Sequence, residues 1–276
     1  MSAETRQLYL DLMKKTLTYT LWPEPPIPLM QSDYGRHAIS RAMVSILSKV
    51  FGAMGIELCR ESNFTERQRA EGHIWPAYAH TMIGIRRLEN LQQCIEVVLD
   101  EHIEGDLIEA GVWRGGACIF MRAVLAAFQV SDRRVFVADS FEGLPKPDAG
   151  KHPADEGDRL HVHSFLSVSE EEVADNFRKY GLLDDQVIFL KGWFKNTLYS
   201  TSINQLSLMR LDGDMYGSTM DALEALYPKL STGGFCVVDD YALPGCRAAV
   251  DDYRESHGMK SEMREIDWTG RYWRKD

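Results

Sequence analysis

Hydrophobic residues recur along the chain with two different spacings, and the change between them divides the sequence in two. Up to residue 104 the apolar positions recur at intervals of three and four, which is typical of amphipathic helices. This pattern predicts helices over residues 6–21, 36–60 and 85–99. Four prolines between Trp22 and Pro28 separate the first two, because proline cannot continue a helix. We expect residues 1–104 to form a helical segment that partly covers the functional site.

From residue 105 onward, short apolar runs alternate with helical patterns. Strands are predicted at 106–109, 134–138, 187–190, 206–211 and 235–238, helices at 117–128, 169–178, 218–229 and 246–257, and a closing hairpin at 266–273. Such alternation is typical of an α/β domain with a mainly parallel sheet. Residues 105–276 are therefore expected to form the core domain. Within it, the polar stretch 140–163 is too long for a simple connection, and we interpret it as a lid or a disordered loop.

Composition and charge narrow the classes of partner. The chain of 276 residues carries 41 acidic and 31 basic side chains, a net charge of -10, which argues against a nucleic-acid partner. No apolar run approaches the ~18 residues of a membrane helix, so no membrane partner is expected. The start of the chain lacks the basic and apolar regions of a signal peptide. Five cysteines without a CxxC pattern indicate reduced thiols, and we predict a cytoplasmic protein.

Paired acids follow two of the predicted strands. Asp212 and Asp214 come directly after the run 206–211, and Asp239 and Asp240 follow 235–238. If these strands are neighbours, four carboxylates meet at one sheet edge, where they repel one another unless a cation lies between them. Oxygen ligands without histidine or cysteine suit Mg²⁺, with Ca²⁺ and Mn²⁺ as alternatives. Three acids for a metal would leave one as a possible base.

A glycine-rich turn, Glu109 to Gly116, follows the first core strand and precedes a helix. Glycines there let a backbone approach a ligand closely, and the helix N-terminus adds partial positive charge. Asp139 closes the next strand, where an acid can accept hydrogen bonds from both hydroxyls of a ribose. The turn and Asp139 together predict a nucleoside-containing cofactor. The dinucleotide fingerprint is absent and Glu109 would repel a pyrophosphate, which favours S-adenosylmethionine over NAD. A plain glycine turn and a helix-capping Asp139 are the alternatives.

With these motifs the chain resembles the macrocin O-methyltransferase family, also called the TylF family. The stretches that carry the resemblance are Trp75-Pro76, Thr81 to Gly84, Gly105 to Gly116, Asp139 to Pro145, Lys191 to Lys195, Leu211 to Tyr216, Asp239 to Tyr241, and Asp267 to Trp273. They cover nearly the whole chain in order. One departure is Asn196 to Ser200, where the family usually continues Thr-Leu-Pro. The departure lies near the expected substrate side, so it bears on the identity of the acceptor.

The resemblance implies a Rossmann-like class I methyltransferase fold and transfer of a methyl group from S-adenosylmethionine to a sugar hydroxyl of a glycosylated natural product, such as a macrolide. It implies Mg²⁺ held by Asp212, Asp239 and Asp240, with Asp214 as the general base. The implied cofactor-binding residues are Met82, Glu109, Gly111, Trp113, Gly115, Asp139 and Ser140. The implied partner is a small-molecule glycoside. The apolar N-terminal segment could cross to a second copy, so we expect a homodimer or a higher homo-oligomer.

Two other functions are compatible with parts of this pattern. A haloacid-dehalogenase-like phosphatase has a similar acid set, but its motif places Thr or Val where Tyr216 stands, and its nucleophilic strand normally opens the domain. Here two strand–helix units precede that strand. A non-catalytic cofactor-binding protein could keep the same fold. The intact acid cluster argues against this alternative, because unused buried acids would cost stability.

Overall fold

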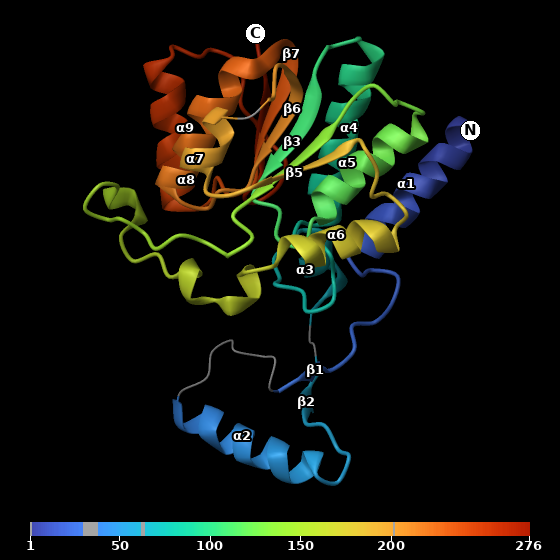
Figure 1. Ribbon diagram of the computed structural model, residues 1–276, viewed down its shortest axis with the longest axis vertical. Helices are drawn as coiled ribbons and strands as arrows, with labels where there is room; N and C mark the ends of the chain where they lie inside the picture. Colours follow the sequence, from blue (N-terminus) through green and yellow to red (C-terminus); the bar gives the residue numbers. More distant parts are fainter. Residues whose placement is uncertain (1, 30–37, 62–63, 201) are drawn as a thin grey trace.

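The computed structural model describes residues 2–29, 38–61, 64–200 and 202–276 (Figure 1). A seven-stranded sheet runs through its centre in the order β5-β4-β3-β6-β7-β9-β8. The strands are β3 (Asp106–Ala110), β4 (Val135–Asp139), β5 (Val187–Lys191), β6 (Leu206–Leu211), β7 (Leu230–Val238), β8 (Arg264–Glu265) and β9 (Arg271–Arg274). The five strands from β5 to β7 pair in parallel, and β9 pairs antiparallel with both β7 and β8. The predicted α/β class with a mainly parallel sheet is thus confirmed.

Helices cover both faces of the sheet, because its strands are apolar on both sides. On one face α1 (Ala3–Leu17), α4 (Ile85–Asp100) and α5 (Gly116–Ala127) pack together, and α7 (Phe194–Thr197), α8 (Tyr216–Leu226) and α9 (Pro244–Ser256) lie on the other (Figure 1). Neighbouring residues of β3 belong to two different hydrophobic cores, one on each face of the sheet. Leu107 packs with α4 and α5, and Ile108 packs with α8 and α9. All six residues of β6 are buried, so this strand lies at the centre of the fold.

The N-terminal residues form two structurally different parts. Helices α1 and α4 belong to the same hydrophobic core as α5, so they are part of the α/β body. The strands β1 (Ile27–Pro28) and β2 (Cys59–Arg60) pair antiparallel, and α2 (Ala38–Gly52) lies beyond them, away from the body (Figure 1). A short α3 (Glu66–Ala70) follows. The proposed division into residues 1–104 and 105–276 stays a prediction. Helices α1 and α4, which precede residue 104, share a hydrophobic core with α5, which follows it.

The boundaries differ from the prediction in a few places. The first helix spans Ala3–Leu17 because Ser2 caps it, and the second starts at Ala38, with 36–37 outside the described residues. Strand β7 begins at Leu230, five residues earlier than predicted, through a stretch that includes two glycines. No helix in the described part of the chain is long and apolar enough to cross a membrane.

The long segment between β4 and α6 (Glu170–Lys179) is folded onto the body. It contains three single-turn helices, Pro153–Asp155, Leu160–Val162 and Ser164–Leu166. Asp155 is buried, and its carboxylate accepts a hydrogen bond of 2.8 Å from the amide of Tyr216 at the start of α8. His152 stacks on the ring of Tyr216 with centroids 4.9 Å apart. These contacts hold the middle of the segment beside the loop that carries Asp212 and Asp214.

Candidate functional site

A cavity of about 550 Å³ opens at the carboxyl ends of β3, β4, β6 and β7. Its volume is in the range of sites that enclose small molecules, and it lies where the strand order reverses, the usual ligand position in open α/β sheets. Every predicted site residue except Gly115 lines it. The strands of the sheet thus bring together residues that are up to 158 positions apart, from Met82 to Asp240.

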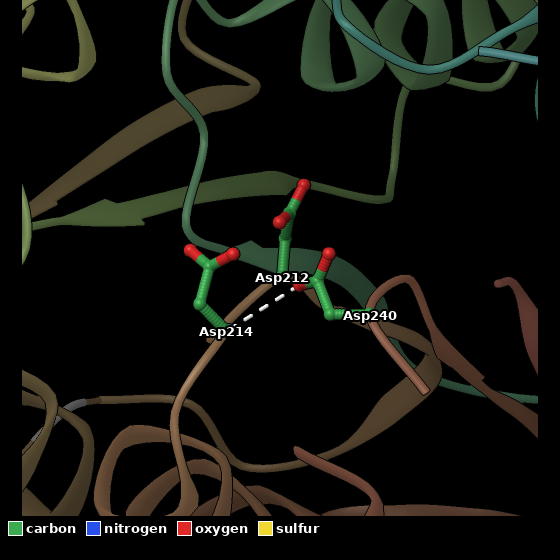
Figure 2. Close-up of side chains that lie close together, drawn as sticks. All are labelled: Asp212, Asp214 and Asp240. Atoms are coloured by element: carbon green, nitrogen blue, oxygen red, sulfur yellow. Dashed lines mark hydrogen bonds between the residues drawn. The ribbon is translucent and has the colours of Figure 1, made fainter. Parts of the chain in front are cut away.

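Three carboxylates converge on one wall of the cavity. Asp212, Asp214 and Asp240 each place an oxygen within 4.8 Å of the others (Figure 2). Strands β6 and β7 are parallel neighbours, which brings their terminal acids to the same edge as predicted. The carboxylate of Asp240 also accepts a hydrogen bond of 3.3 Å from the amide of Asp214. The group is a possible binding site for a metal ion.

The backbone of Asp214 is not extended like the strand before it. Asp214 instead has a left-handed conformation with φ of 56°, so the chain turns sharply after β6. Aspartate tolerates this conformation better than most residues. The turn, and not strand alternation, places the Asp214 carboxylate beside the other two.

Burial and mutual repulsion act on all three acids. Burial raises the pKa of Asp214 and Asp240 well above the usual range, and repulsion by Asp212 adds to it. The pKa of Asp212 is also raised, first by burial and then by the charge of Asp239. Crowded carboxylates of this kind are stabilised in their ionised form by a cation between them. An all-oxygen donor set fits a hard divalent ion such as Mg²⁺.

Asp239 is not among the three converging carboxylates and lies between two buried arginines. It forms ion pairs with Arg87 of α4 and with Arg210 of β6. We expected Asp239 to lie with the other metal-binding acids. Its different position follows from the two arginines, which compete for its carboxylate. Arg210 was visible as a charge inside an apolar run, a signal that a buried partner is needed, whereas nothing in the sequence related Arg87 to this edge.

Glu109 lines the cavity, and both of its carboxylate oxygens have partners within the protein. It pairs with Arg210, and it accepts a hydrogen bond of 2.8 Å from the Cys118 thiol. Burial raises the pKa of Glu109 to about 7, although Arg210 opposes this shift. Arg210 also donates a 3.0 Å hydrogen bond to Asp212. Arg210 therefore connects the start of the glycine turn to the acid group.

The glycines of the turn make room for the protein's own backbone, whereas we interpreted them as room for a ligand. Gly111 has a φ of 91°, and a Cβ there would lie 1.9 Å from the carbonyl oxygen of Asp212. A Cβ on Gly115 would lie 2.7 Å from a methyl group of Val173 in α6, which explains why Gly115 does not line the cavity. Close packing between the turn and the acid loop thus depends on Gly111.

Gly111→Ala should lower the free energy of unfolding by more than the ~1–3 kcal/mol that a strained backbone alone costs, because the new Cβ also overlaps Asp212. Gly181→Ala is the matched control: its φ is 66°, but nothing lies within 4 Å of the added carbon. Urea unfolding of both variants separates the two contributions. Equal destabilisation would show that the contact with Asp212 does not matter.

Asp139 and Ser140 hold the neighbouring turn in place. The Asp139 carboxylate accepts hydrogen bonds of 2.8 Å from the amides of Val112 and Phe141, one on each oxygen. The Ser140 hydroxyl donates to the carbonyl of Gly143 at 2.8 Å. A carboxylate has about four lone-pair sites, so Asp139 can still accept hydrogen bonds from a ligand. It joins the two turns that form one end of the cavity.

Aromatic and basic side chains also line the cavity. They are Trp75, Trp193, Phe194, Trp268, Lys146, Lys151 and Lys195. Trp113, in the glycine turn, donates a hydrogen bond of 2.9 Å to the carbonyl of Phe165 and so ties the long 140–168 segment to the cavity.

Comparison with known proteins agrees with this geometry. The family model of the macrocin O-methyltransferases (TylF) matches residues 6–275. An 8-demethyl-8-(2,3-dimethoxy-alpha-L-rhamnosyl)-tetracenomycin-C 4'-O-methyltransferase from Streptomyces olivaceus is 48% identical over 99% of this chain and 95% of the relative. A demethyldecarbamoylnovobiocin O-methyltransferase from Streptomyces niveus is 47% identical over 97% of this chain and 93% of its own.

A solved structure has the same fold, and a third relative is similar in sequence. The O-methyltransferase NovP superimposes with a TM-score of 0.83 at 46% identity, covering 98% of this chain and 99% of NovP. A mycinamicin III 3''-O-methyltransferase from Micromonospora griseorubida is 44% identical in sequence over 98% of this chain and 96% of the relative. The resemblance inferred from the motifs and the class I methyltransferase fold are both confirmed. The chain therefore belongs to the macrocin O-methyltransferase (TylF) family.

Proposed function

We propose that the protein transfers a methyl group from S-adenosylmethionine to a hydroxyl of a sugar on a glycosylated natural product. The observation that carries the proposal is the convergence of Asp212, Asp214 and Asp240 on the wall of a cavity of about 550 Å³. Family membership over the whole chain supports it, as do the names of the relatives, which describe O-methylation of antibiotic compounds. A phosphatase would leave the donor end of the cavity unexplained.

The donor is proposed to lie at the end formed by the two turns. Asp139 would accept hydrogen bonds from the ribose with the lone pairs that Val112 and Phe141 leave free. Met82, Gly111, Trp113 and Ser140 line the same end of the cavity. Glu109 lies beneath them and keeps Arg210 in place. Gly115 contributes through its packing on α6 and not through contact with the donor.

The metal site is proposed at Asp212, Asp239 and Asp240. Asp212 and Asp240 already converge, and Asp239 would bind with lone pairs that its two arginine partners leave free. Magnesium is usually held by few carboxylates and keeps other positions for water or substrate, so two or three acids suffice. Titration of Asp239→Asn with Mg²⁺ tests this set. An unchanged affinity would remove Asp239 and leave Asp214 as the third ligand.

Asp214 is proposed to accept the proton of the acceptor hydroxyl as its oxygen takes the methyl group and the bond from that methyl to the donor sulfur breaks. Magnesium, when bound, would lower the pKa of the hydroxyl and orient it through a vicinal hydroxyl. Asp212 and Asp240 would hold the ion beside Asp214, since an oxygen of each carboxylate lies within 4.8 Å of the others. Tryptophans that line the cavity would hold the sugar and exclude water, and alignment of the two substrates supplies much of the rate.

The proposal is tested by incubating the purified protein with S-adenosylmethionine, Mg²⁺ and a panel of rhamnosylated polyketides, glycosylated macrolides and glycosylated aminocoumarins. Mass spectrometry should detect addition of one methyl group to at least one of them. Release of phosphate from an aryl phosphate would favour the phosphatase alternative instead. Calorimetric binding of S-adenosylmethionine without turnover of any glycoside would favour a non-catalytic cofactor-binding protein.

A homodimer or a higher oligomer is part of the same proposal. Apolar side chains of α2 are exposed: Met43, Ile46, Leu47 and Val50. An exposed apolar stripe of this kind is typical of a surface that another chain covers. Sedimentation measurements test this assembly. A cytoplasmic location stays a prediction; it is supported by the five cysteines, all within the described residues and none in a disulfide.

A further inference from the structure

Arg87 joins three segments that are far apart in the sequence. It comes from α4, and its side chain is 6% exposed. One guanidinium nitrogen pairs with Asp239, and Nε donates a 3.0 Å hydrogen bond to Asp267 in the turn before β9. A third nitrogen donates to the carbonyl of Gly72 at 3.4 Å. The planar fork of an arginine can hold two carboxylates in fixed directions, which the single charge of a lysine cannot.

The surrounding chain is shaped around this side chain. A Cβ on Gly72 would lie 2.3 Å from Nη2 of Arg87, and a Cβ on Gly270 would lie 3.2 Å from its Cδ. Asp267, the second carboxylate partner, is buried and also accepts hydrogen bonds of 3.0 and 2.8 Å from the amides of Thr269 and Gly270. Arg87 therefore occupies a position that the backbone on two sides keeps open for it.

Arg87 controls the orientation of Asp239 directly. Asp239 is 4% exposed, and its two carboxylate oxygens face different arginines: Oδ1 faces Arg210 and Oδ2 faces Arg87. The Thr269 hydroxyl binds the Asp239 carbonyl at 2.9 Å, so the turn that Asp267 stabilises also holds the Asp239 backbone. Removing Arg87 would leave Oδ2 of the Asp239 carboxylate without its arginine partner.

We propose that Arg87 is a positioning residue for the cation site, acting through Asp239. This inference rests on the proposed function, since it assumes that Asp239 faces a bound Mg²⁺. Residues that hold metal ligands from behind typically change metal affinity by about 10- to 100-fold when they are replaced. The N-terminal helical segment thereby supplies a side chain on which the acid edge of the core depends.

If Arg87 acted only as a neighbouring positive charge, its removal would change the affinity for Mg²⁺ in the opposite direction. A cation near a Mg²⁺ site repels the ion, so removal of a plain charge should strengthen Mg²⁺ binding. Removal of a positioning group should weaken it. The sign of the change therefore distinguishes the two roles. Arg87→Lys adds a second distinction, because it keeps the charge and loses the fork that holds Asp239 and Asp267 together.

The experiment is calorimetric titration of the full-length protein with MgCl₂ for the wild type, Arg87→Met, Arg87→Lys and the control Arg122→Met. Arg122 is a matched control, since it is also buried and pairs with a carboxylate, Asp184, but does not line the cavity. Both Arg87 variants are expected to bind Mg²⁺ about 10- to 100-fold more weakly, and the control should bind like the wild type. Circular dichroism identifies any variant that is unfolded, and Arg87→Lys is the milder change.

Each outcome decides between specific statements. Wild-type affinity in Arg87→Lys, or tighter binding in Arg87→Met, would overturn the positioning role and leave the metal site intact. A wild type that binds no Mg²⁺ would overturn the proposed metal site itself and this inference with it. A double-mutant cycle with Asp239→Asn adds a test of the route. If Arg87 acts through Asp239, its replacement should have little further effect in that background, and additive losses would contradict it.

Discussion

Replacement of Asp214 by asparagine is expected to lower kcat by about 10²- to 10⁴-fold, the usual contribution of a general base. Asparagine has nearly the same shape but cannot accept the proton of the acceptor hydroxyl. It also tolerates the left-handed backbone found at this position, so the turn after β6 should persist. The backbone amide that donates to Asp240 is unaffected by the change. The affinity for S-adenosylmethionine should therefore stay close to that of the wild type.

Steady-state kinetics with a glycoside acceptor, together with calorimetry of donor binding, measure both quantities. Asp175→Asn is a suitable control, because Asp175 lies on the exposed face of α6 and pairs with Arg178 at the surface. An Asp214→Asn enzyme with full activity would remove the assignment of the base. Loss of Mg²⁺ affinity in the same variant would show that Asp214 is a metal ligand, as its position beside Asp212 and Asp240 permits.

Removal of divalent metal is expected to lower the rate by about 10³-fold, corresponding to roughly 4 kcal/mol of transition-state stabilisation. The three converging acids are partly buried and repel one another, so the ionised site depends on a cation to balance its charge. Added Mg²⁺ should restore the rate. It should also raise the thermal stability of the apo protein, by about 2.7 kcal/mol at a concentration 100 times its Kd.

Dialysis against a chelator, with the residual metal content measured by atomic emission, gives the apo protein for this assay. The Asp212→Asn variant should lose both the Mg²⁺-dependent rate and the Mg²⁺-dependent stabilisation, since Asp212 is common to the predicted and the observed acid groups. A metal-free protein that methylates a glycoside at the wild-type rate would contradict the role of the cation. Stabilisation by Mg²⁺ without any effect on the rate would limit the ion to a structural role.

The parts of the site that could be predicted are those that depend on one short stretch of sequence each. A buried parallel strand is a continuous apolar run, and β6 ends where the charges of Asp212 and Asp214 begin. Parallel strands bring their ends to one edge, so the meeting of Asp212 with Asp240 followed from two local patterns. The two turns at Gly111 and Asp139 were recognisable in the same way.

Contacts between distant segments could not be predicted. Arg87 lies 152 positions before Asp239, and its helix looks like an ordinary amphipathic helix in sequence. The pairing depends on how α4 packs on the sheet, which no local period encodes. The direction of Asp214 likewise depends on a single left-handed residue. The requirement for Gly111 comes from the carbonyl of Asp212, which directly follows another strand, so the sequence alone pointed to a ligand instead.

Several contacts fasten the segment 140–168 to the rest of the chain, among them those of Asp155 with Tyr216 and of the carbonyl of Phe165 with Trp113. Between these two contacts lies Leu160, which lines the cavity. Chimeras that exchange this segment between relatives could therefore alter acceptor choice without disturbing the methyl donor end. Such grafts would need to retain Asp155 and the small residues Gly217 and Gly245, beside which His152 and Asp155 pack.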